Sequence, residues 1–251
     1  MNLAGLWHCI LAEWKIKLFL GGAITGVFWL CYFLLERLPD ASVTKMPELA
    51  IDRMIPFQPG ASFIYVTQFA IMPLVIWLMS SRHQLFLCCR GLALLVGISF
   101  VVFYFWPTSV ARPQTAPGNH FLFDLIAGAD LPRNACPSLH AAFGVFTVGC
   151  AWDLFRDWTN RRWLMAATGL WTVAVLASTL LIKQHVVLDL VAGGFLGMMS
   201  WWFAAKMPGL DLAREKHSHA SLAGIKFRTS LALDEQERNQ SRAGENDLPS
   251  L

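Results

Sequence analysis

The sequence is poor in charged residues. Asp, Glu, Lys and Arg make up only 15% of the 251 residues, whereas hydrophobic residues make up 55% and the mean hydropathy is +0.47. This composition is too apolar for an ordinary soluble domain of this length. The net charge of +3 is spread along the chain, and no basic cluster is interleaved with aromatic residues. Nucleic acid is therefore not expected as a partner.

The sequence also lacks cofactor-binding motifs and the Cys-x-x-Cys spacing of a thiolate metal site. Four of its cysteines, Cys31, Cys88, Cys89 and Cys150, lie within apolar runs, where cysteine packs as a small hydrophobic residue. Cys136 is expected on the outer side and has no evident partner. These absences argue against a disulfide framework, and we expect no cofactor and no metal.

Long apolar runs are what the sequence does contain. Six stretches approach the length of about 20 residues with which a helix crosses a hydrocarbon core of roughly 30 Å. They are Lys17 to Leu35, Ala61 to Met79, Leu85 to Trp106, Ser138 to Phe155, Trp163 to Ile182 and His185 to Ala205. The sequence thus predicts an all-α fold, a polytopic membrane bundle of six transmembrane helices followed by a polar C-terminal tail.

Basic residues in alternate short loops predict the orientation, because such loops usually face the cytoplasm. These residues are Arg82, Arg90, Arg156, Arg161, Arg162 and Lys206. We expect a multi-pass protein of a bacterial-type inner membrane with both termini in the cytoplasm. Residues 1–206 would form the membrane domain, and residues 207–251, which are rich in polar residues, a disordered cytoplasmic tail.

His185 and Asp189 begin the sixth predicted span four residues apart, on one face of a helix. The carboxylate can keep one ring nitrogen protonated, which leaves the other as a free lone pair for nucleophilic or base chemistry. A plain structural pair that fixes the helix in the bundle is the alternative. Ionisable groups at membrane depth are costly, so a functional role is the first hypothesis.

Pro137 and Ser138 precede the fourth span, where Ser138 is a natural helix cap. The free amides of the first helical turn form an anion site, and His140 lies one turn in, within reach of a bound phosphate. A capped helix with a lone histidine at the interface is the alternative interpretation.

Two cations complete the predicted outer-face site. Arg112 offers a guanidinium fork suited to phosphate oxygens, although most loop arginines contact only solvent or lipid headgroups. Lys183 is a weaker candidate because a lysine at a span end often extends to the interface. His140, His185 and Asp189 could instead ligate a metal, but the basic surroundings disfavour a cation.

These residues resemble the type 2 phosphatidic acid phosphatase superfamily of integral membrane enzymes. That family carries an Arg-Pro motif, then Pro-Ser-x-His, then a stretch that ends in His-x-x-x-Asp. Here the corresponding segments are Arg112-Pro113, Pro137–His140 and Ser178–Asp189, in the same order. The resemblance covers about residues 52 to 197.

The sequence departs from the family pattern at two cations. Phe105 stands where the first motif usually begins with lysine, and Thr179 stands where the third motif has arginine. With Asn134 to His140 and Gln184-His185, the chain looks more like the branch that contains inositol phosphorylceramide synthases and their bacterial relatives. That branch includes transferases as well as phosphatases.

The resemblance implies a mechanism and a substrate class. His185 would attack phosphorus and form a phosphohistidine, Asp189 would orient it, and His140 would protonate the departing alkoxide. Phosphate binding would fall to Arg112, Ser138 and Lys183, and no metal would be needed. The substrate would be a lipid phosphate such as phosphatidate or an isoprenyl phosphate, taken from among the membrane lipids.

Three functions remain open from the sequence. The first is a lipid phosphate phosphatase with its active site on the extracytoplasmic side. The second is a phosphotransferase that passes a phosphate-bearing headgroup to a lipid alcohol. The third is a non-catalytic membrane protein or transporter that binds anionic lipids through the basic residues of its outer face. The sequence does not determine the oligomeric state.

Overall fold

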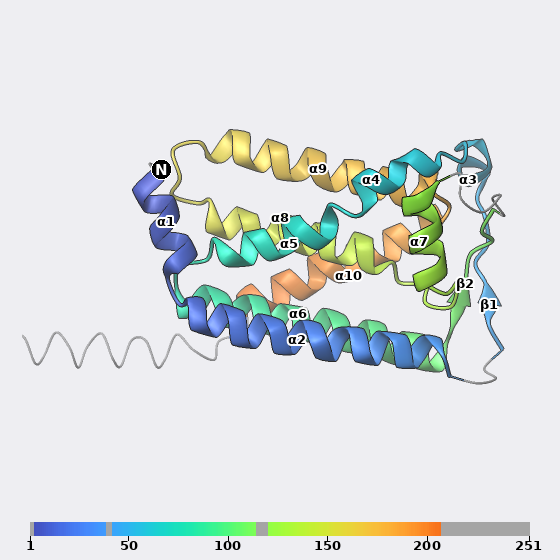
Figure 1. The fold of residues 1–251 in the computed structure, drawn as a ribbon, viewed down its shortest axis with the longest axis horizontal. Helices are drawn as coiled ribbons and strands as arrows, with labels where there is room; N and C mark the ends of the chain where they lie inside the picture. Colours follow the sequence, from blue (N-terminus) through green and yellow to red (C-terminus); the bar gives the residue numbers. More distant parts are fainter. Residues whose placement is uncertain (1–2, 39–41, 114–119, 207–251) are drawn as a thin grey trace, which may run out of the picture. The chain divides into compact units, whose positions relative to one another are not determined.

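Helices make up most of the fold (Figure 1). The computed structural model describes residues 3–38, 42–113 and 120–206, so the predicted tail lies outside the described residues. Residues up to Lys206 form one compact unit. Its longer helices are α2 (Trp14–Glu36), α5 (Gln68–Trp77), α6 (Arg82–Phe105), α8 (Leu139–Leu154), α9 (Arg161–Leu181) and α10 (Val187–Lys206). The shorter elements are α1 (Leu3–Leu11), β1 (Thr44–Lys45), α3 (Ala50–Met54), η1 (Pro59–Ala61), α4 (Ser62–Tyr65), β2 (Thr108–Ser109) and α7 (Phe121–Ala129).

Five of the described segments are long and apolar enough to cross a membrane: α2, the run Pro59–Trp77, α6, α9 and α10. The chain therefore has the character of a membrane protein. The fourth predicted span corresponds to α8, an apolar helix of 16 residues, which is shorter than the others. The second is a run of η1, α4 and α5 rather than one continuous helix, with a break at Val66 and Thr67.

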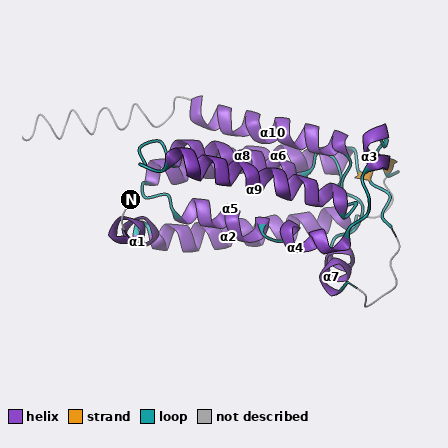
Figure 2. Ribbon diagram, turned by 90° about the horizontal axis from the view of Figure 1, so that it is seen from above, coloured by secondary structure: helices purple, strands orange, loops and turns teal. Residues whose placement is uncertain are grey.

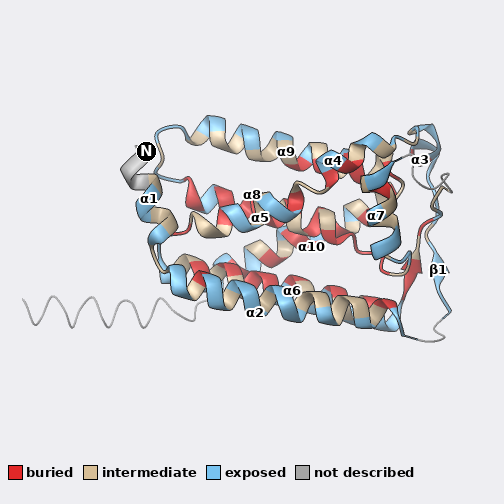
Figure 3. Ribbon diagram, in the orientation of Figure 1, coloured by how far each residue is buried: buried red, intermediate tan, exposed pale blue. Residues whose placement is uncertain are grey.

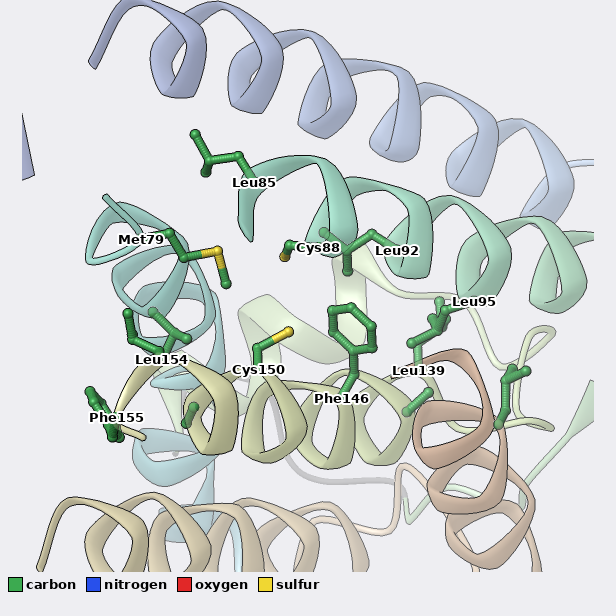
Figure 4. Close-up of a cluster of buried hydrophobic side chains, with 14 of the residues drawn as sticks. Met79, Leu85, Cys88, Leu92, Leu95, Leu139, Phe146, Cys150, Leu154 and Phe155 are labelled. Carbon is green, nitrogen blue, oxygen red and sulfur yellow. The ribbon is translucent and has the colours of Figure 1, made fainter. Parts of the chain in front are cut away.

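The central helix is α8, which contacts α5, α6, α9 and α10. Most of its residues are buried, whereas α2 and α9 expose large parts of their surface (Figure 3). The core lies mainly between α6 and α8, where Phe146 of α8 packs among Cys88, Leu92 and Leu95 of α6 (Figure 4). This arrangement explains why α8 shows no polar face.

Glycines allow α8 and α10 to pack backbone to backbone. A Cβ atom on Gly193 would lie 2.1 Å from the carbonyl oxygen of Ser138, and one on Gly197 would lie 2.2 Å from that of Ala142. Small residues at such positions are typical of helices that associate within membranes. The close approach fixes the start of α8 against the first turns of α10.

One end of the bundle carries short elements that hydropathy alone does not predict. The strands β1 and β2 pair in parallel, with Thr44 opposite Thr108 and Lys45 opposite Ser109. Thr108 also forms a bridge with Asn134. The helices α3 and α7 lie at the same end (Figures 1 and 2). These elements order the loops that lead into α8 and α10.

Candidate active site

The N-terminus of α8 is capped as the sequence predicts. Ser138 is the cap residue, and its hydroxyl accepts a hydrogen bond from the amide of Ala141 at 3.3 Å. Helix geometry leaves the amides of Leu139 and His140 without a partner within the helix. The amide of Ser138 itself donates to the carbonyl oxygen of Asp189 at 3.1 Å. A direct backbone bond thus joins the second motif to the third.

His185 lies in the turn just before α10 rather than within the helix. Its Nδ1 is 3.5 Å from Oδ2 of Asp189, and both side chains are buried. The same carboxylate oxygen accepts a hydrogen bond from the amide of Val186 at 3.2 Å. Asp189 therefore holds the turn and lies beside the histidine, and no hydrogen bond joins the two side chains at this distance.

The turn between α9 and α10 depends on a residue with a left-handed backbone. Lys183 has a φ of 57°, at the position after a helix C-terminus where glycine is usual. The amide of Gln184 donates to the carbonyl of Thr179 at 3.0 Å and closes the turn. Residues other than glycine adopt this conformation at a cost of about 1 kcal/mol or more, so the surrounding contacts must stabilise it.

Those contacts involve the side chain of Lys183. Its Nζ donates to the carbonyl oxygens of Asp52 at 2.8 Å and of Ile55 at 2.7 Å. The buried carboxylate of Asp52 in turn accepts hydrogen bonds from the amides of Leu49 and Val187. The ammonium thus ties α3 to the turn and keeps one further N–H donor. Its predicted role in phosphate binding stays a prediction.

His140 lies in an aromatic environment. Its ring centroid is 4.3 Å from that of Tyr65 in α4 and 6.2 Å from that of Phe69 in α5. Its carbonyl oxygen accepts a hydrogen bond from the side-chain amide of Gln68 at 3.0 Å. These contacts fix the position of the imidazole at the cap of α8.

The rings of His140 and His185 lie next to each other and are tilted. Their centroids are 5.6 Å apart, with an interplanar angle of 57°. Two imidazoles at this separation can both reach a group of the size of a phosphate bound at the start of α8. The two motifs that carry these histidines therefore contribute to one site.

Arg112 is held by Asp130, the residue that follows α7. Its guanidinium donates to the Asp130 carboxylate at 2.9 Å and also to the Asp130 carbonyl oxygen. The hydroxyl of Tyr32 in α2 donates to the other carboxylate oxygen at 2.6 Å. Burial acts to raise the pKa of Asp130, but the Arg112 guanidinium, together with side-chain hydrogen bonds from Glu36 and Tyr32, holds this pKa below its usual value.

This ion pair lies close to His140 and Tyr65. The charge of Asp130 acts on His140, and those of Asp130 and Arg112 act on Tyr65, whose ring contacts His140. The Arg112 guanidinium is only 16% exposed, and its Nε atom has no hydrogen-bond partner among the described residues. Arg112 can therefore offer donors to an anion while Asp130 sets its orientation.

Cys136 is the cysteine next to the cap, and its surroundings make it unreactive. Burial, with a smaller contribution from the charge of Asp189, raises the pKa of the thiol to about 11. Its amide donates to the Thr108 hydroxyl at 2.8 Å. A thiol with this pKa is neutral at physiological pH, so the cysteine is not the nucleophile of the site.

Two buried amides flank the motifs. The side chains of Asn134 and Gln184 are 6% and 2% exposed, and none of their nitrogen or oxygen atoms has a partner among the described residues. Their neighbours Ala135 and Val186 pack in one hydrophobic cluster, which brings the two segments together. Unpaired buried amides are costly, so these groups are candidates for contacts with a bound molecule.

The remaining features of the bundle offer no comparable chemistry. Within residues 3–38, 42–113 and 120–206, no group of three or more His, Cys, Asp or Glu side chains is arranged to hold a metal ion. A cavity of about 180 Å³ lies at the opposite end of the bundle, near Met79, Leu154 and Ala205. It is remote from the histidines at the start of α8 and α10.

The comparison with known families bears directly on this site. The model described as PAP2 superfamily matches residues 130–211. This PAP2 match contains the second and third motifs, with Ser138, His140, His185 and Asp189, and leaves Arg112 outside. No curated protein and no solved structure matches the chain. The finer resemblance to inositol phosphorylceramide synthases stays a prediction.

The PAP2 match covers both segments whose histidines lie together in the structure. Several residues around them were not predicted from the sequence. Asp130, Tyr65, Gln68 and Asp52 contact site residues from loops or helices that carry no motif. No signal in the sequence distinguishes them from other polar or aromatic residues. Gln184 adjoins a motif histidine in the sequence. Its burial in the structure, and not this position, makes it a candidate for contact with a bound molecule.

Proposed function

We propose that this chain is an integral membrane lipid phosphate phosphatase that works through a phosphohistidine at His185. One observation carries the proposal: the imidazoles of His140 and His185 are 5.6 Å apart at the capped start of α8. The similarity of residues 130–211 to the PAP2 superfamily supports it, because that superfamily generally has phosphatase or phosphotransferase activity. We propose membership of that superfamily on the same grounds.

The reaction proceeds in two displacements. His185 Nε2 attacks phosphorus while Asp189, 3.5 Å from Nδ1, stabilises the charge that develops on the ring. The bond to the lipid oxygen breaks, and His140 transfers a proton to that oxygen. Water then attacks the phosphohistidine, His140 accepts its proton, and inorganic phosphate leaves with His185 restored. Splitting the reaction in this way replaces one difficult step by two easier ones.

Charge stabilisation in this mechanism comes from three sources. The first-turn amides of α8 and its helix dipole face the phosphate oxygens at the Ser138 cap. Arg112, oriented by Asp130, supplies a guanidinium. Lys183 supplies the third N–H of its ammonium. Such preorganised donors are the largest single contribution in many enzymes.

In the proposed orientation, the site lies on the extracytoplasmic side of a bacterial-type inner membrane. The chain then crosses the membrane six times if α8 is counted as a crossing. Supporting it, Arg82 begins α6, Arg161 begins α9 and Lys206 ends α10, all at the ends of these helices opposite the histidines. Basic residues at that end favour the cytoplasm for it.

A second candidate is a phosphotransferase that uses a lipid alcohol in place of water. The buried amides of Asn134 and Gln184 favour it, because they could hydrogen-bond the hydroxyls of an acceptor or headgroup. Both functions share the phosphohistidine and differ only in the acceptor.

Phosphate release by purified protein in detergent, with phosphatidate as substrate, tests the proposal. His185→Asn keeps the size and polarity of the side chain but removes the nucleophile, so turnover should fall by at least about 10³-fold. His83→Asn, the same exchange at the start of α6 and at the other end of the bundle, serves as the matched control. Unchanged turnover in His185→Asn would favour a non-catalytic lipid-binding protein, and label transferred to a second lipid would favour the phosphotransferase.

A further inference from the structure

The helix α7 runs across the bundle axis at the end that carries the site (Figures 1 and 2). It contains nine residues, Phe121–Ala129, of which Asp124 alone is ionisable. Phe123 is buried at 2% exposure, whereas Phe121 and Leu125, one turn apart, are 78% and 56% exposed. The helix thus presents one apolar face to the protein and another away from it.

The inner face of α7 packs on a residue that contacts His140. Phe123 packs with Tyr65 and Ile182, and its ring centroid is 5.2 Å from that of Phe57. Tyr65 in turn contacts the ring of His140 at 4.3 Å. At the C-terminal end of the helix, Asp130 holds Arg112. A change in the position of α7 would therefore reach both a histidine and the phosphate-binding arginine.

The helix α7 packs against a membrane-spanning run that also exposes an apolar side chain. The helix contacts α4, which belongs to the run Pro59–Trp77 and exposes Phe63 at 70%. At a rise of about 1.5 Å per residue, nine residues are too short to cross a bilayer. A short apolar helix that lies across the ends of the spans fits the plane of the membrane interface.

We propose that α7 is an interfacial helix that docks on the leaflet holding the substrate, with Phe121 and Leu125 in contact with lipid acyl chains. The lipid phosphate then reaches the two histidines with its own chains alongside α7. This inference rests on the proposed function, because it assigns the surface against which a lipid substrate lies. The proposal predicts that changes to the outer face of α7 lower kcat/KM for long-chain substrates and leave the chemical steps unaffected.

The experiment compares two substrates in the same reconstituted vesicles. Dioleoyl phosphatidate embedded in phosphatidylcholine needs the interface, whereas dibutyryl phosphatidate reaches the site from water. In Phe121→Ser/Leu125→Ser, we expect kcat/KM for the long-chain substrate to fall at least about tenfold relative to that for the short-chain one. An unchanged ratio of the two values overturns the proposal, including the case in which both fall equally.

A matched control exists at the opposite end of the bundle. The helix α1, at that end (Figure 1), also contains nine residues. Its Trp7 and Leu11, again one turn apart, are 57% and 61% exposed. Trp7→Ser/Leu11→Ser removes a similar apolar area far from the site. This variant should leave the ratio of long-chain to short-chain turnover within about twofold of the original value.

Membrane contact can be measured without turnover. A photoactivated carbene reagent that partitions into the bilayer should label the peptide containing Phe121 and Leu125 in the unmodified protein, as strongly as it labels exposed positions of α2. Absence of label on that peptide overturns the proposal. Because this readout does not depend on activity, its failure is distinguishable from a failure of the proposed function, which His185→Asn tests.

Discussion

Asp130 orients Arg112 through two hydrogen bonds, one to its carboxylate at 2.9 Å and one to its carbonyl oxygen. Because the pair is largely buried, removal of the carboxylate leaves the guanidinium without a counter-ion and with only the Asp130 carbonyl oxygen to orient it. The proposed phosphate-binding role of Arg112 therefore depends on a residue outside the three motifs.

Asp130→Ala is expected to raise KM for a lipid phosphate about tenfold or more, because Arg112 loses its fixed orientation. A double-mutant cycle with Arg112→Ala measures this dependence. The double variant should be no worse than Arg112→Ala alone, with an interaction energy of about 1–3 kcal/mol. Additive losses would show that Asp130 acts independently of Arg112. Tyr32→Phe, which removes only a supporting hydrogen bond, should have a smaller effect.

His140→Ala is expected to lower kcat by about 10²–10⁴-fold for a lipid phosphate, because the departing alkoxide then leaves without a proton. An aryl phosphate with a stable phenolate leaving group should be far less affected in formation of the phosphohistidine. Burst kinetics, which separate this step from its hydrolysis, provide the measurement. Equal losses for alkyl and aryl substrates in the first step would contradict a general-acid role.

Gly193→Ala should destabilise the protein by at least about 1–3 kcal/mol, because the new Cβ would lie 2.1 Å from the carbonyl oxygen of Ser138. The adjacent Gly194 provides the control, since its Cβ would meet nothing nearer than 3.6 Å. Gly194→Ala should be neutral, or stabilising by up to about 1 kcal/mol from helix propensity. Thermal unfolding in detergent distinguishes the two, and similar midpoints would contradict the close packing of α8 on α10.

The thiol of Cys136 should show an unusual pH dependence. Its pKa is raised to about 11, so the neutral thiol is favoured in the folded protein. This contribution to stability is present below the thiol's unfolded pKa of about 8.5 and is lost as pH rises through the folded value. Alkylation by iodoacetamide, followed by peptide mass spectrometry, should therefore still accelerate above pH 9. A plateau near pH 9 in the folded protein would contradict the buried geometry.

The parts of the fold that sequence predicts well depend on local patterns. Apolar runs predict α2, α6, α9 and α10 because the length needed to cross a membrane is fixed by the bilayer. The cap at Ser138 follows from the hydrogen-bonding needs of a helix terminus and is confirmed. The short α8 and the break before α5 were not predicted, because both depend on packing with neighbours.

The surroundings of the site could not be predicted, because they depend on residues that meet only in three dimensions. The spacing of His185 and Asp189 predicts that they face each other, since both lie near one helix start. Nothing local to Arg112 predicts Asp130 as its partner, and nothing local to Lys183 predicts its left-handed backbone or its bonds to α3. Contacts of this kind join residues far apart in the sequence and leave no periodic pattern by which they could be predicted.

The hydrogen bond between Ser138 and Asp189 joins two backbone groups, the amide of Ser138 and the carbonyl oxygen of Asp189. It therefore does not depend on the identity of either side chain. During divergence, a descendant could exchange the histidines or the carboxylate and keep the same scaffold with a new chemistry or none. We therefore expect inactive descendants that keep the fold. The fold alone would not be sufficient evidence to assign an activity to them.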